Sequence, residues 1–277
     1  MRGSLFIIAG GINVFVTEYL KSVKPAPPKE CPCGDIGKGI RQFRGDKQMN
    51  KETYGLLEDY MLCCMTDAAH DKEHVYRVLY NALEIAGEEA DVDYDILIAA
   101  CLLHDIGRKE QFENPALCHA AVGSEKAYRF LLAHGFEVPY AEQVKQCIRT
   151  HRYRKNISPQ SLEAKILFDA DKLDVTGAIG IARTLVYKGI VCEPLYTVLP
   201  DGTVSTGEND IEPSFFQEYK YKLEKIYASF YTKTAMEIAK KRQHSAIEFY
   251  NSLYQEVSPS YENGIDRLHN LLEGGLK

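Results

Sequence analysis

Histidine and aspartate side chains recur in this sequence where an apolar stretch ends or faces inward. The run from Ile96 to Leu103 is apolar on every side, which predicts a buried helix, and His104 and Asp105 follow it directly. A histidine alone would suit a helix C-terminus, with Gly107 as a left-handed cap, but the Asp105 carboxylate lies at the unfavourable end of the helix dipole. Because buried charge is costly unless it is paired or bound to a cation, a metal ion accounts for both residues better.

Other groups that could bind the same ion lie elsewhere in the chain. His74 shares the apolar stripe of a predicted helix, and Asp171 shares that of a later one. His119 opens one predicted helix, and His151 ends the stripe of another. Any one of these histidines could be a hydrogen-bonded core residue, but the joint pattern favours a metal site. Mixed imidazole and carboxylate ligands suit manganese, iron, zinc or nickel better than calcium and leave positions open for water.

Helical periodicity dominates the chain, and no segment alternates as strands do. The sequence therefore predicts an all-α fold, in which helix ends bring these groups together. Residues 108–115 are expected to form a loop after the buried helix, and residues 193–213 a long polar loop. A long helical region from Ser214 to about Val257 and a short final helix follow.

Residues 1–48 differ from the rest and are expected to be a poorly ordered extension, with the working domain spanning residues 49–277. The apolar stretch from Leu5 to Val16 is too short to span a bilayer, and no convincing cleavage site follows it. We therefore expect no membrane association.

Composition narrows the class of protein further. The chain has 277 residues, 45% of them hydrophobic and 26% charged, as is usual for a soluble globular protein. Its net charge of −6 argues against a dedicated DNA or RNA binder. Its eight cysteines form no regular disulfide framework, which favours a reducing, cytoplasmic location.

The order of His74, then His104-Asp105, then Asp171 resembles that of the HD-domain superfamily of metal-dependent phosphohydrolases. Residues 70–74, 171–183 and 222–242 are similar to a subgroup of small bacterial HD hydrolases. The resemblance covers roughly residues 55–255 of the chain.

The resemblance implies an HD-type helical bundle with a divalent cation held by His74, His104, Asp105 and Asp171. Family members that bind two metals add two histidines between the His-Asp pair and the last aspartate. His119 and His151 occupy that order here. One or two ions of manganese, iron, magnesium, zinc or nickel are therefore expected.

The expected reaction is hydrolysis of a phosphate ester or phosphoanhydride by a metal-activated water. Asp105 would ligate the metal and orient the water, and Arg108 and Lys109 are placed to meet phosphate charge in catalysis. Arg152 and Arg154 are candidate substrate-binding residues. All four basic residues could instead belong to solvated surface loops.

The expected substrate is a small phosphorylated molecule, with a nucleotide favoured by the resemblance. One alternative is a non-catalytic HD module that senses a ligand or serves as a scaffold. Another is an RNA-end phosphohydrolase, since residues 149–155 form a local basic segment.

Overall fold

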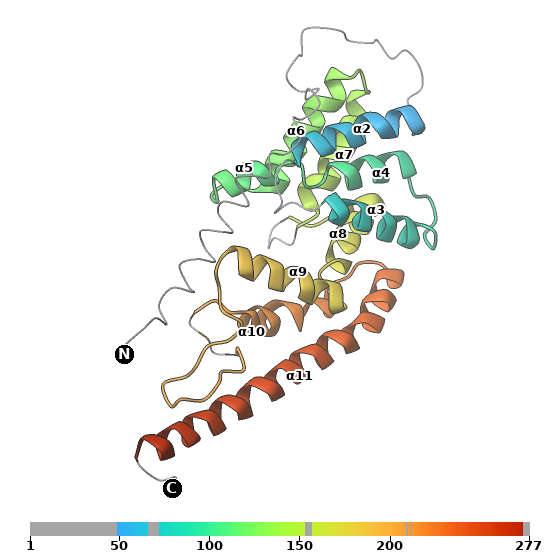
Figure 1. The fold of residues 1–277 in the computed structure, drawn as a ribbon. Coiled ribbons are helices and arrows are strands. Elements are labelled where there is room, and N and C mark those ends of the chain that lie inside the picture. Colours follow the sequence, from blue (N-terminus) through green and yellow to red (C-terminus); the bar gives the residue numbers. More distant parts are fainter. Residues whose placement is uncertain (1–48, 66–71, 153–156, 209, 211, 274–277) are drawn as a thin grey trace.

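The computed structural model describes residues 49–65, 72–152, 157–208, 210 and 212–273. Within these ranges there is no strand, and Val198 and Val204 form an isolated antiparallel bridge. The all-α prediction is confirmed (Figure 1). The predicted extension over residues 1–48 lies outside the described residues.

The α-helices form a bundle, which is followed in the sequence by a C-terminal group of helices. They are α2 (Lys51–Cys64), α3 (Lys72–Ala86), α4 (Tyr94–Leu103), α5 (Arg108–Glu113), α6 (His119–Ala133), α7 (Val138–Thr150), α8 (Leu162–Leu173), α9 (Gly177–Ile190), α10 (Phe215–Glu218) and α11 (Lys233–Leu272).

Helix α4 lies at the centre of the bundle, in contact with α2, α3, α6, α7 and α8. Its N-terminus is capped by Asp93, whose carboxylate accepts hydrogen bonds from the backbone N–H groups of Asp95 (3.0 Å) and Ile96 (3.1 Å). Because apolar side chains surround this helix, only enclosure by neighbouring helices removes them all from water. The predicted buried helix is thus observed, and its C-terminal end delivers His104 into the interior.

The turn after α4 is shaped by close packing against α6. A Cβ atom on Gly107 would lie 2.4 Å from the carbonyl oxygen of His119 and 2.6 Å from the backbone nitrogen of Gly123. Gly107 has a φ of −98°, so it is not the left-handed cap that the alternative interpretation of this helix end required. The expected loop over residues 108–115 is also wrong, because residues 108–113 form α5. Glycine is needed at position 107 because α6 crosses there, which local sequence does not reveal.

The C-terminal group has its own apolar core, formed by aromatic side chains of α10, of the π-helix Tyr219–Leu223 and of α11. Phe215 and Phe216 are fully buried, and the rings of Tyr219 and Tyr250 stack with centroids 4.2 Å apart. Figure 1 shows α11 running diagonally past α9 and α10 and extending beyond them. This core holds the long polar loop against the helices.

Helix α11 continues through Pro259 and does not break into two helices as expected. Proline removes one backbone hydrogen bond and crowds the preceding turn, but it does not always end a helix. Here the hydroxyl of Ser258 donates to Glu262 (3.0 Å), which links the turns on either side of the proline.

Asp169 on α8 anchors the start of α11. Its carboxylate is fully buried and accepts hydrogen bonds from the backbone N–H of Tyr231 (2.9 Å) and from both the N–H and the hydroxyl of Thr232 (2.7 Å each). Thr232 is itself the N-cap of α11. One side chain therefore satisfies the donors at the point where the C-terminal helix joins the bundle.

None of the helices in the described ranges combines the length and the apolar character needed to cross a membrane.

Replacing Asp169 with alanine should lower the free energy of unfolding by about 2–3 kcal/mol, because buried backbone donors lose their acceptor. Urea denaturation measures the change. Glu237→Ala removes a carboxylate from the exposed face of α11 and should change stability by less than about 0.5 kcal/mol. Equal effects of the two substitutions would contradict the anchoring role of Asp169.

Candidate metal centre

The structure brings all of the predicted metal ligands together at one end of the bundle. They are His74 on α3, His104 and Asp105 after α4, His119 at the start of α6, His151 after α7, and Asp171 on α8. The four histidines and Asp105 are buried, and the Asp171 side chain is 18% exposed. Each ligand therefore comes from a helix end or an inner helix face, and the cluster retains one partly open side.

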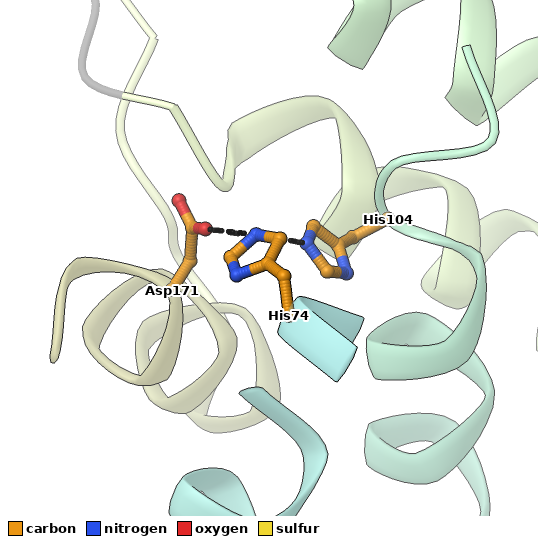
Figure 2. Close-up of side chains that lie close together, drawn as sticks. All are labelled: His74, His104 and Asp171. Atoms are coloured by element: carbon orange, nitrogen blue, oxygen red, sulfur yellow. Dashed lines mark hydrogen bonds and ion pairs between the residues drawn. The ribbon is translucent and has the colours of Figure 1, made fainter. Parts of the chain in front are cut away.

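The ligands form two groups of three. The first trio is His74, His104 and Asp171, and the atoms that could bind a metal lie within 4.8 Å of one another. Figure 2 shows the imidazole of His74 between the other two side chains. Its Nε2 lies 3.4 Å from His104 Nε2 and 3.3 Å from Asp171 Oδ1.

The second trio is Asp105, His119 and His151, whose metal-competent atoms also lie within 4.8 Å of one another. The two Nε2 atoms of His119 and His151 are 3.2 Å apart. Oδ1 of Asp105 is 3.4 Å from the former and 3.7 Å from the latter.

Asp105 lies between the two trios. While its Oδ1 faces His119 and His151, its Oδ2 lies 3.5 Å from His74 Nε2 and 3.6 Å from His104 Nε2. One carboxylate thus presents one oxygen to each trio, which is the arrangement that a carboxylate bridging two ions requires.

Backbone carbonyls fix the orientation of two of the imidazoles. His104 Nδ1–H donates to the carbonyl of Cys101 (2.7 Å), and His151 Nδ1–H donates to that of Ile148 (2.6 Å). The last carbonyls of a helix have no partner within it, so a histidine placed just after α4 or α7 satisfies them. This contact leaves the proton on Nδ1 and directs the Nε2 lone pair into the cluster.

His74 is held from outside by Asp174, at the end of α8. Its Nδ1–H donates to Asp174 Oδ2 (2.7 Å), and the same carboxylate accepts from Arg77 Nε (2.7 Å) and Arg183 Nη1 (2.6 Å). A carboxylate behind a metal-binding histidine fixes its ring and increases its basicity.

The first trio fits a cation because its inward-facing nitrogen and carboxylate atoms need positive charge among them. Nδ1 of both His74 and His104 is occupied by an outer acceptor, so their Nε2 atoms, 3.4 Å apart, must share an added proton or bind an ion. Although burial alone lowers the pKa of His74, hydrogen bonds to Asp105, Asp171 and Asp174 raise it to about 10. Without a metal, a proton on His74 therefore supplies the positive charge, and a divalent ion would replace it.

The other three histidines of the two trios stay neutral at physiological pH. Burial lowers the pKa of His151 to about 4 and that of His119 to about 2, and burial also lowers the pKa of His104. Neutral imidazoles are the form that binds a metal. Both trios thus offer imidazole and carboxylate donors that could hold a divalent metal ion, as the sequence predicts.

The predicted basic residues differ in their placement. Arg108 Nε donates to Asp105 Oδ1 (2.9 Å); burial raises the pKa of Asp105, but the charge of Arg108 outweighs it and holds the pKa well below its usual range. Arg152 Nη1 lies 3.4 Å from His119 Nδ1. Lys109 is exposed on α5, and Arg154 lies outside the described residues. Of the four, Arg108 and Arg152 contact the cluster.

The residues that hold the trios from outside were not predicted from the sequence. Besides Asp174, these include Gln111, whose Oε1 accepts from His119 Nδ1 (2.5 Å). One signal was present for Asp174, which lies three residues after Asp171 and so near the same side of α8. Gln111 lies in the segment that was taken for a loop, so no periodicity pointed to it.

Comparisons with known proteins relate this chain to HD-domain proteins. A family model described as the HD domain matches residues 72–176. The protein YpgQ of Bacillus subtilis (strain 168), described as uncharacterized, is 29% identical over 207 residues, which cover 73% of this chain and 92% of YpgQ. The crystal structure of an HD-superfamily hydrolase from Bacillus thuringiensis is 27% identical, with a TM-score of 0.56 over 74% of this chain and 96% of that one.

A crystal structure of Bacillus subtilis YpgQ in complex with ADP has a TM-score of 0.57 and 24% identity to this chain. It covers 74% of this chain and 97% of its own. At this level of identity, the structural likeness is one of fold.

Replacing Gly107 with alanine should lower stability by about 1–3 kcal/mol, because the added methyl group overlaps the backbone of α6. Displacing α6 also moves His119 relative to Asp105, so metal affinity should fall. Thermal unfolding and metal titration measure the two effects. Gly55 on α2 has open space around it, and Gly55→Ala should instead stabilise the protein by about 0.5–1 kcal/mol.

Replacing Asp174 with asparagine should weaken metal binding about 10–100-fold, because His74 loses its negatively charged outer partner. Competition with a chelator measures the affinity. Asp201→Asn removes a carboxylate from the surface loop and should leave it unchanged. Parental affinity in the Asp174 variant would show that His74 needs no such support.

Metal binding at pH 8 should release about one proton from His74, whose pKa in the metal-free protein is raised to about 10. The sign follows from the shift: the charged form persists up to about pH 10, so the ion must displace a proton throughout the neutral range. Titration in weakly buffered indicator dye measures the release. Binding without proton release at this pH would contradict the assignment.

Proposed function

Because the chain belongs to the HD-domain superfamily, we propose that it is a metal-dependent phosphohydrolase that acts on a nucleotide. One observation carries the proposal. Asp105 presents one carboxylate oxygen to each of the two trios, and the histidines of both trios direct Nε2 toward it. The complex of YpgQ with ADP supports a nucleoside phosphate as the ligand class.

In this proposal, His74, His104, Asp105 and Asp171 would hold one divalent ion, and His119 and His151 with Asp105 would hold a second. A bound divalent ion makes water more acidic and draws charge from a phosphoryl oxygen. The bond formed joins the water oxygen to phosphorus, and the bond broken joins phosphorus to the bridging oxygen that leaves.

The residues around the ligands orient the reactants. Since the pKa of Asp105 is held well below its usual range, its carboxylate accepts a hydrogen bond and does not supply a proton. Arg108 is held by that carboxylate, its side chain is 31% exposed, and it would bind a phosphate oxygen. Arg152 would bind the phosphate chain, and we assign Lys109 and Arg154 supporting roles in the same electrostatic attraction.

A cytoplasmic location is part of the proposal. All of the cysteines in the described ranges are unpaired, and Cys63 and Cys64 are adjacent in the chain, which suits a reducing compartment.

The proposal is tested by elemental analysis of the purified protein, together with a hydrolysis screen in manganese. The screen compares nucleoside triphosphates and diphosphates, phosphomonoesters and RNA with a 5′-phosphate. The expected result is bound metal and turnover of free nucleotides. Binding of ADP without turnover of any compound would favour the ligand-sensing alternative, and turnover confined to RNA would favour the RNA-end alternative.

Replacing His104 with alanine should remove the metal and lower activity more than about 100-fold, because the first trio loses a ligand. Metal content and rate are measured on the same preparation. His134→Ala is the matched control, since His134 donates to the Phe130 carbonyl at the far end of α6. A parental rate in the His104 variant would refute the proposed function.

A further inference from the structure

The two trios differ in how much negative charge their carboxylates provide. The first trio contains Asp171 and shares Asp105, while the charge of Asp174 behind His74 is balanced by Arg77 and Arg183. The second trio has two neutral imidazoles and a share in Asp105. A divalent ion is therefore neutralised far better in the first trio than in the second.

Two guanidinium groups lie beside the second trio. Arg108 Nε donates to Oδ1 of Asp105, the same oxygen that faces His119 and His151 (2.9 Å). Arg152 Nη1 lies 3.4 Å from His119 Nδ1. Both positive charges oppose the entry of a cation, and Arg108 already engages the carboxylate oxygen that the cation needs.

His119 has two contacts at its outer nitrogen. Its Nδ1–H donates to Gln111 Oε1 (2.5 Å), and Arg152 Nη1 lies 3.4 Å from the same nitrogen. The positive charge of Arg152 therefore lies against the ring whose Nε2 would have to bind the ion.

We infer that the second trio takes up a divalent ion only together with a phosphate group, which lies against Arg108 and Arg152. The phosphate adds the missing negative charge and an oxygen ligand. It also neutralises the charge of Arg152 beside His119, whose Nδ1–H donates to Gln111 and whose Nε2 faces the cluster. This inference rests on the proposed function and specifies that the substrate's own phosphate completes the centre.

The test measures Mn²⁺ binding to the intact chain by equilibrium dialysis, with and without inorganic phosphate. One tightly held ion is expected without phosphate and two with it. The affinity for the second ion should rise by about 5–150-fold, the usual range of coupling between two sites. Because coupling is reciprocal, Mn²⁺ should raise the affinity for phosphate by the same factor.

Substitutions separate this coupling from general charge effects. Arg152→Ala should strengthen the second ion in phosphate-free buffer and reduce the phosphate effect toward one. Arg149→Ala removes the same charge from the exposed side of α7 and should leave both values unchanged. His119→Asn should abolish the second ion and keep the first.

Two equally tight ions without phosphate would overturn the inference and leave the proposed function intact. A single ion with phosphate present would do the same. If no ion binds under either condition, both the inference and the metal-dependent reaction fail.

Discussion

The structure depends on inward-facing imidazole lone pairs that require positive charge at the centre of a helical bundle. Three of the four rings have Nδ1 fixed by a backbone carbonyl or by Asp174. These rings therefore cannot rotate to turn Nε2 away from the cluster without losing a hydrogen bond. Buried carboxylates and lone pairs gathered this closely would destabilise the fold unless a proton or a metal ion balanced them. The same constraint that makes the site reactive therefore also makes it part of the stability of the bundle.

The sequence pointed to the residues of the two trios because the carboxylates among them break a local rule. A carboxylate after an apolar helix, as at Asp105, or on an apolar stripe, as at Asp171, conflicts with burial unless a cation is present. Asp174, Gln111 and Arg183 break no such rule, since polar residues near helix ends are ordinary. Their roles arise only when α8, α5 and α9 pack against the ligands.

Other features escaped prediction for the same reason. The sequence offers Gly107 as a possible helix cap, while its actual constraint is the passage of α6. It also predicts a separate final helix from Ser258, but α11 continues through Pro259 to Leu272. The all-α architecture and the buried α4 followed from periodicity alone. Periodicity shows which face of a helix must be buried, but not which neighbouring helix packs against that face.

The dispersion of the ligands along the chain has a further consequence. They come from α3, the end of α4, α6, the end of α7 and α8, so no single helix can separate from the bundle and leave the centre whole. Local unfolding of any one of these helices removes a ligand and so loses the free energy of metal coordination. Bound metal therefore stabilises all of these helices against local unfolding. Loading the site thus converts segments that would otherwise fray one at a time into a single cooperative unit.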